Sequence, residues 1–97
     1  MPTRLLLRER RVVGEGQFAE VVIWDLTESV PGSSHDFKYR LAFAVDEVCV
    51  VRFDNETGKG DHKHIGEEQV PYTFTSLAQL IADFWIAIEA WRPDEQG

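Results

Sequence analysis

The chain has 97 residues, of which 43% are hydrophobic and 11% aromatic, so it is long and apolar enough for one globular domain with a thin core and is unlike a disordered chain. Its single cysteine excludes an intramolecular disulfide and fits a reducing cytoplasm. The N-terminal apolar run is too short for a signal-peptide core and no later run could span a bilayer, so we expect a cytoplasmic protein without a membrane partner.

The formal net charge of −7 argues against a nucleic-acid partner, because polyanions bind basic surfaces. The charge is unevenly distributed, with −2 on residues 1–64 and −5 on residues 65–97. Nine of the ten Lys and Arg residues lie in the first of these segments. A fold that gathered half of them on one face would create a positive patch, so RNA stays open as a partner.

Alternating apolar and polar residues predict three strands, over residues 4–13, 18–26 and 36–45. The last of these has the clearest alternation, from Phe37 to Val45. Between the second and third strands, Pro31 and Gly32 form a good turn pair. The chain therefore reads as strands first and a helix last.

A fourth strand is predicted over residues 48–55, joined to the third by Asp46 and Glu47 as a two-residue turn, although this pair is a poor sequence for such a turn. We expect Lys38, Tyr39 and Arg40 to meet Arg52 and Asp54 at the far end of this hairpin. The register that follows from the turn pairs Val45 with Val48, Leu41 with Arg52, Arg40 with Phe53 and Tyr39 with Asp54. A longer loop in place of the two-residue turn would shift this register by one residue.

A polar loop is predicted over residues 56–64, and a short strand between Ile65 and Phe74 that Pro71 would confine to a sheet edge. Ser76 begins a capping box for a helix over residues 76–92, which Pro93 ends. The apolar residues at helical spacing are Leu77, Leu80, Ile81, Phe84, Ile88 and Trp91. The predicted fold class is α+β: an antiparallel meander of four to five strands followed by one C-terminal helix packed on the sheet.

Residues 52–64 contain the densest set of chemically useful groups. Gly58 and Gly60 flank Lys59, so the backbone there can bring N–H groups close to an anion such as phosphate. The alternative is an ordinary solvated hairpin loop, which has the same composition. The candidate substrate-binding residues are Arg40, Arg52, Asn55, Gly58, Lys59 and Gly60.

His62 and His64 are separated by one residue, so on an extended segment both rings point to the same side. Histidine suits general acid and base catalysis because its ordinary pKa is near ~6.5. The candidate catalytic residues are His62, His64, Asp54 and Asp61. His62, His64 and Asp54 could instead bind a metal ion, but they lack a clear fourth ligand, so metal-independent chemistry without a cofactor is favoured.

The order of elements, the segment Pro-Gly-Ser-Ser-His-Asp-Phe-Lys-Tyr-Arg-Leu (31–41) and the segment Arg-Phe-Asp-Asn-Glu-Thr-Gly-Lys-Gly-Asp-His-Lys-His (52–64) resemble the TumE-type family of small bacterial toxin–antitoxin proteins. The resemblance extends from Leu7 to Trp91. It implies a toxin encoded beside a helix-turn-helix antitoxin that neutralises it. Phe53 stands where many relatives have tyrosine, and Glu47 where a glycine would complete the turn.

Three functions are compatible with these observations. The first is a toxin that acts as a ribonuclease through residues 52–64. The second is a non-enzymatic protein-binding module in which that segment is a structural loop, and the third is a metal-binding protein. The expected partner is the helix-turn-helix antitoxin, which would cover residues 52–64 or hold the helix flank 83–91; RNA binding and a homodimer stay open.

Overall fold

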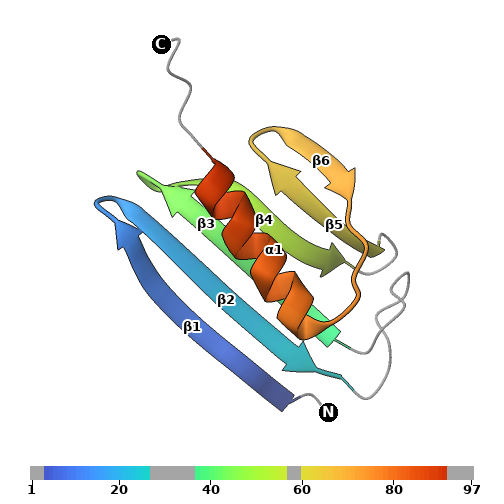
Figure 1. The fold of residues 1–97 in the computed structure, drawn as a ribbon. Coiled ribbons are helices and arrows are strands. Elements are labelled where there is room, and N and C mark those ends of the chain that lie inside the picture. Colours follow the sequence, from blue (N-terminus) through green and yellow to red (C-terminus); the bar gives the residue numbers. More distant parts are fainter. Residues whose placement is uncertain (1–3, 27–36, 57–59, 92–97) are drawn as a thin grey trace.

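A computed structural model describes residues 4–26, 37–56 and 60–91. Its six strands form one antiparallel sheet in sequence order, and one helix follows them (Figure 1). The elements are β1 (Arg4–Gly14), β2 (Gln17–Asp25), β3 (Phe37–Val45), β4 (Val48–Glu56), β5 (Gly60–Ile65), β6 (Glu68–Pro71) and α1 (Leu77–Ala90). The α+β meander with one C-terminal helix is therefore confirmed, with six strands in place of four to five.

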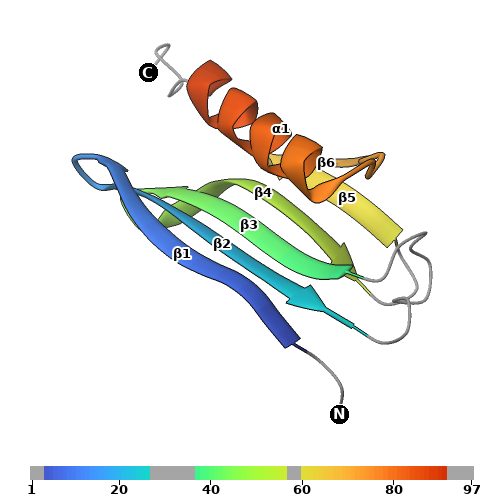
Figure 2. The same ribbon diagram turned by 60° about the horizontal axis from the view of Figure 1, so that its bottom comes forward.

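The helix α1 covers one face of the sheet, and no other element of the described residues covers the opposite face (Figure 2). Ser76 caps the helix by accepting a hydrogen bond from the backbone N–H of Gln79 at 3.0 Å. Leu80, Phe84 and Ile88 lie on the buried side of α1. The core that they join contains Ala19, Val21, Ile23, Tyr39, Leu41, Phe43, Val51 and Phe53.

The hairpin between β3 and β4 turns at Asp46 and Glu47, as predicted. Both residues have positive φ angles, 50° and 72°, which are unfavourable for side chains other than glycine. The backbone N–H of Asp46 donates a hydrogen bond of 2.8 Å to the carbonyl of Gly16 in the neighbouring β1–β2 turn. This bond ties the two turns together and helps to hold the strained pair in place.

The register of this hairpin differs from the predicted one after its first two residue pairs. Val45 pairs with Val48 as expected, but the register shifts between Phe43 and Ala44, and Val50 becomes the extra residue of a β-bulge. The observed pairs are Arg40 with Asp54, Leu41 with Phe53 and Ala42 with Arg52. Because a shift of one residue exchanges the two faces of a strand, Arg52 and Asp54 lie on the face opposite the helix, and Phe53 lies in the core.

The segment predicted as a loop over residues 56–64 contains the strand β5. The loop prediction is therefore wrong for residues 60–64: β5 has the polar composition of a loop, yet each of its residues from Gly60 to Ile65 pairs with β4. The next strand, β6, is the exposed edge strand expected before the helix and ends at Pro71. In the described residues, no helix is long and apolar enough to cross a membrane.

The face opposite α1 is called the open face, and it collects positive charge. Residues paired across adjacent strands share a face, so the register defines two neighbouring rows on it. The first row contains Arg8, Val22, Arg40, Asp54 and His62, and the second contains Arg10, Glu20, Ala42, Arg52 and His64. With Lys38, which pairs with Trp24, five of the eight Lys and Arg residues that the structure describes in segment 1–64 lie on the open face.

Candidate active site on the open face

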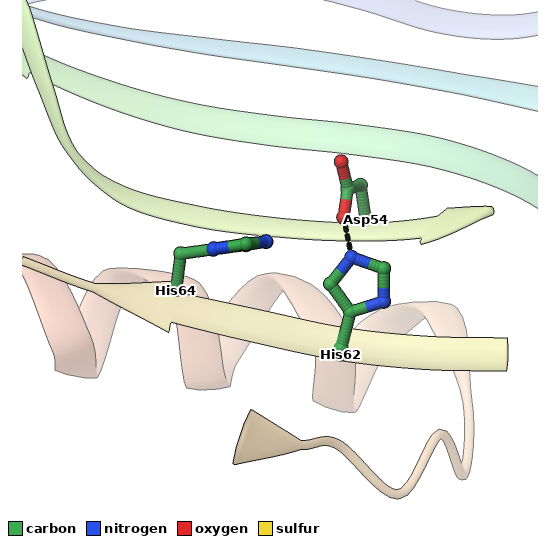
Figure 3. A group of neighbouring side chains, drawn as sticks. All are labelled: Asp54, His62 and His64. Atoms are coloured by element: carbon green, nitrogen blue, oxygen red, sulfur yellow. Dashed lines mark ion pairs between the residues drawn. The ribbon is translucent and has the colours of Figure 1, made fainter. Parts of the chain in front are cut away.

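Asp54 on β4 and His62 and His64 on β5 project together from the open face (Figure 3). Asp54 is directly opposite His62 in the sheet, and Arg52 is directly opposite His64. Alternate residues of a strand point to the same side, so these four side chains form one compact group. This group is called the Arg-Asp-His cluster.

His62 is the most deeply buried member of the cluster, with 3% of its surface exposed. Its Nε2 lies 2.7 Å from Oδ1 of Asp54, and its Nδ1 lies 3.3 Å from the carbonyl oxygen of Gly60. Both ring nitrogens therefore face protein atoms. This environment fixes the ring and leaves it little access to a substrate.

Arg52 connects Asp54 to His64. Its Nε lies 3.1 Å from Oδ2 of Asp54, and its Nη2 lies 2.9 Å from Nε2 of His64. A guanidinium only donates hydrogen bonds, so Nε2 of His64 is the acceptor and the proton of the neutral ring is on Nδ1. His64 is only partly buried. It is thus the histidine with an unprotonated nitrogen beside a fixed positive charge.

Asn55 lies on the helix side of the sheet, away from the cluster. It is fully buried, its amide oxygen accepts a hydrogen bond from the Tyr39 N–H at 3.0 Å, and its amide nitrogen donates to the Phe37 carbonyl at 2.6 Å. Lys38 also donates to the Asn55 carbonyl. These bonds fasten the start of β3 to β4, which is a structural role.

Asp61, predicted as catalytic, also points away from the cluster. Its Oδ2 accepts a hydrogen bond of 2.7 Å from the hydroxyl of Tyr39, which is 1% exposed. Burial, together with the bond to Asp61, raises the pKa of Tyr39 well above its usual range. Asp61 therefore holds a neutral tyrosine at the end of the sheet.

Three further predicted residues belong to the possible phosphate site. Gly58 and Lys59 lie outside the described residues. Gly60 has a φ of 75°, in the region that favours glycine, and its carbonyl faces His62. Arg40 is exposed on the open face, in the same row as Asp54.

A hollow of about 250 Å³ lies beside the cluster on the open face, and Asp54 belongs to its wall. Its lining residues are Arg8, Val22, Trp24, Lys38, Tyr39, Arg40 and Asp54. Sequence reasoning missed Arg8 and Trp24 as site residues. Arg8 alternates with Arg10 on one side of its predicted strand, but the alternation of residues 18–26 does not mark Trp24. A second hollow of about 400 Å³ shares Arg40 with the first.

Asp54, His62 and His64 can be tested as metal ligands. One ligand atom from each lies within 4.8 Å of the others, and carboxylate with imidazole is a donor set that suits zinc. However, the Arg52 guanidinium already contacts Asp54 and His64. A cation held by these ligands would be repelled by it, so the set fits a metal only if Arg52 turns away.

The structure defines a small α+β protein. It has a six-stranded meander with one covering helix, and a candidate site, the Arg-Asp-His cluster, on the open face. The chain belongs to the TumE family, because the family model described as toxin TumE matches residues 2–92, nearly its whole length. No curated protein and no solved structure matched significantly. The family resemblance of segments 31–41 and 52–64 is confirmed, and the protein is a toxin component of a toxin–antitoxin system, which implies an antitoxin partner.

Proposed function

We propose that this toxin is a ribonuclease that cleaves phosphodiester bonds without a metal ion at the Arg-Asp-His cluster. The observation that carries the proposal is the contact of 2.9 Å between Arg52 and Nε2 of His64. In this contact a proton acceptor, Nε2 of His64, lies beside a guanidinium that can bind a phosphate. Other Arg residues lie on the same face of the sheet. RNA carries its own nucleophile, the 2′-hydroxyl, so a proton acceptor and phosphate-binding cations supply most of what its cleavage needs.

In the proposed reaction, Nε2 of His64 takes the proton of the 2′-hydroxyl while the 2′ oxygen forms a bond to phosphorus. The bond from phosphorus to the 5′ oxygen breaks, and that oxygen takes a proton from water. The products are a 2′,3′-cyclic phosphate and a 5′-hydroxyl, and the protonated His64 returns its proton to solvent. Arg52 turns from His64 toward the non-bridging oxygens as the phosphate enters, and Arg40 adds a second positive charge.

Asp54 and His62 are positioning residues in this scheme. Asp54 holds Arg52 through Nε, and His62 holds Asp54 through the contact of 2.7 Å. The two histidines therefore have different roles, in contrast to the paired acid and base expected from their spacing. This division follows from burial, since only His64 has a surface that RNA can reach.

The test is incubation of the purified protein with total RNA, with and without a chelator, followed by analysis of the cleaved ends. We expect cyclic phosphate ends in both conditions, and a loss of about 100-fold or more in rate for His64→Ala. Lys63→Ala is the matched control, because Lys63 precedes His64 on β5 but lies over the Phe53 ring on the helix side. Undiminished cleavage by a folded His64→Ala protein would reject the proposal.

A metal-dependent ribonuclease is the second candidate, favoured by the convergence of Asp54, His62 and His64. It would use both histidines as ligands and a bound water as the proton acceptor or nucleophile. It predicts that a chelator abolishes cleavage and that zinc restores it. Chelator resistance would instead support the metal-free scheme.

We propose that the antitoxin is a helix-turn-helix protein and that it neutralises the toxin by covering the Arg-Asp-His cluster or by holding the flank of α1. The flank has an exposed apolar residue, Ile86, which is 60% exposed, with Asp83 and Glu89 on the same helix. Co-expression with the neighbouring gene should give co-purification and a complex more resistant to heat than the toxin alone. A protein that binds the antitoxin and arrests growth without cleaving RNA would be a non-enzymatic binding module.

A further inference from the structure

The hollow of about 250 Å³ on the open face has the composition of a site for an aromatic anion. Trp24 supplies a partly buried aromatic side chain, and Val22 adds an apolar surface. Arg8 and Arg40 are exposed at this hollow and make no ion pair within the described residues. Positive charge around an aromatic surface is the combination with which proteins bind single-stranded nucleic acid.

The size of the hollow suits one nucleobase. An engineered protein cavity of about 150 Å³ holds benzene, so about 250 Å³ is enough for a larger planar ring. A whole oligonucleotide does not fit, which means that the remaining nucleotides would lie across the open face. The second hollow, which contains Phe18 and shares Arg40, continues along the same face.

The hollow and the Arg-Asp-His cluster are contiguous because Asp54 belongs to both. Arg40 pairs with Asp54, and Arg52 is in the next row, roughly 7 Å away along the strand. That separation is comparable to the distance between successive phosphates of an extended single strand. A base in the hollow would therefore place an adjacent phosphodiester at Arg52 and His64.

We propose that this hollow binds one base of single-stranded RNA, stacked on Trp24, with Arg8 and Arg40 on the flanking phosphates. The assignment of the bound strand as a substrate rests on the proposed ribonuclease function. The base site itself does not, because binding is measured without cleavage. It defines the substrate class as unpaired RNA, since a base inside a duplex is not available for stacking on a side chain.

The binding test uses Trp24 as its own reporter. The chain has three tryptophans, and Trp85 and Trp91 contact Phe84 and Phe43 on the helix side. A Trp85→Phe/Trp91→Phe protein therefore reports on Trp24 alone, and His64→Ala in the same chain prevents cleavage. Its fluorescence is titrated with a single-stranded oligoribonucleotide, with an abasic phosphodiester of equal length and with a mononucleotide.

We expect quenching by the oligoribonucleotide at concentrations on the order of 10-fold lower than with either of the other two probes. Equal quenching by the abasic strand would overturn the base site, because charge alone would explain binding. Equal affinity for the mononucleotide would overturn the assignment to single-stranded RNA. Both comparisons are made at one fixed salt concentration, because phosphate contacts depend on salt.

Three variants locate the site, and their binding is measured by the fluorescence anisotropy of a labelled oligoribonucleotide, because replacement of Trp24 removes the intrinsic reporter. Trp24→Leu should weaken oligoribonucleotide binding about 10-fold and leave abasic binding unchanged, whereas Trp24→Phe should keep most of the affinity. Arg8→Gln should weaken both ligands, since it removes a phosphate contact. Arg11→Gln is the matched control, because Arg11 is on the same strand but lies over the Trp85 ring on the helix side; it should change neither. A folded Trp24→Leu protein with unchanged RNA affinity would overturn the proposal.

Cleavage by the chain with its native His64 separates the two proposals. RNA-specific quenching by a protein that does not cleave RNA would keep the base site and reject the ribonuclease. Cleavage that is undiminished in Trp24→Leu would reject the base site and keep the ribonuclease. If the protein shows neither RNA-specific quenching nor cleavage, the first result rejects the base site and the second rejects the ribonuclease.

Discussion

Arg52 donates a hydrogen bond of 2.9 Å to Nε2 of His64 across the β4–β5 ladder. The bond fixes which nitrogen of His64 lacks a proton, and it places a positive charge where a metal ion would otherwise stand between the same ligands. The proposed chemistry depends on one step, in which Arg52 leaves His64 and binds the phosphate of the incoming RNA.

The two histidines should respond differently to removal. His62→Ala should lower the melting temperature, because it removes the shorter of the two charged contacts of the Asp54 carboxylate, which is 9% exposed, and leaves only the contact with Arg52. The expected loss of unfolding free energy is about 1–3 kcal/mol. For so small a domain, each kcal/mol lowers the melting temperature by roughly 4–8 °C. His64→Ala should leave the melting temperature nearly unchanged and remove cleavage. If both variants stay folded and cleave RNA or arrest growth at the parental rate, the cluster is structural.

Zinc should bind only after Arg52 has been removed. In the parental protein the guanidinium contacts two of the three candidate ligands, so added zinc should not raise the melting temperature. In Arg52→Ala the ligands face one another without that charge, and zinc should stabilise the fold by mass action. Thermal melts with and without zinc compare the two proteins. Stabilisation of the parental protein by zinc would favour the metal-dependent candidate.

The protein should unfold in alkali before its tyrosines ionise. Burial, then the hydrogen bonds to Asp61 and Asp83, raise the pKa of Tyr39 and of Tyr72 above their ordinary value of about 10. A group that keeps its proton more tightly in the folded state stabilises the fold fully below its unfolded pKa, and this stabilisation is lost as the pH rises above about 10. Phenolate absorbance and circular dichroism should therefore change together. Phenolate formation in a protein that still has native dichroism would contradict this.

Glu47→Gly should stabilise the β3–β4 hairpin. Glu47 has a φ of 72°, which costs a non-glycine residue on the order of 1 kcal/mol. Relief of that strain should exceed the entropy cost of glycine and raise the melting temperature by several degrees. Glu67→Gly is the control, because Glu67 occupies the β5–β6 turn beside Gly66 without a positive φ, so it should slightly lower the melting temperature. Equal shifts for the two variants would argue against strain at Glu47.

The attachment of α1 should depend on Phe84 and hardly on Ile86. Phe84 is fully buried with its ring centroid 6.0 Å from that of Phe53, so Phe84→Ala should cost about 3–5 kcal/mol of unfolding free energy. Ile86 is 60% exposed, and Ile86→Ala should cost less than about 0.5 kcal/mol. Denaturant unfolding measures both values. A weakened complex with the antitoxin in the second variant would assign the flank of α1 to the partner.

Much of the fold could be predicted because its strands alternate and its helix has a clear cap. From Phe37 to Val45 every second residue points to the core, and Ser76 marks where α1 begins. The bulge could not be predicted, because Val50 and Val51 are both apolar and give no sign of which residue is extra. Only the observed pairing therefore shows on which face of the sheet Arg52 and Asp54 lie.

Of the candidate site, the sequence could predict residue types that lie near one another but not their arrangement. Spacing on an extended strand correctly placed His62 and His64 side by side, with ring centroids 5.1 Å apart. It could not show that Asp61 turns to Tyr39, because that contact joins β5 to β3 across the sheet. Trp24 was missed for the same reason, since its hollow is built by residues of four strands.

The bulge at Val50 also bears on how relatives of this chain should be aligned. A relative that lacks this residue would have a regular hairpin after the same two-residue turn, and every later position of β4 would keep its face. Its counterpart of Phe53 would still enter the core, and its counterparts of Arg52 and Asp54 would still lie on the open face. A single gap placed at Val50 is therefore neutral for the chemistry of the family, and length variation in this hairpin should concentrate there.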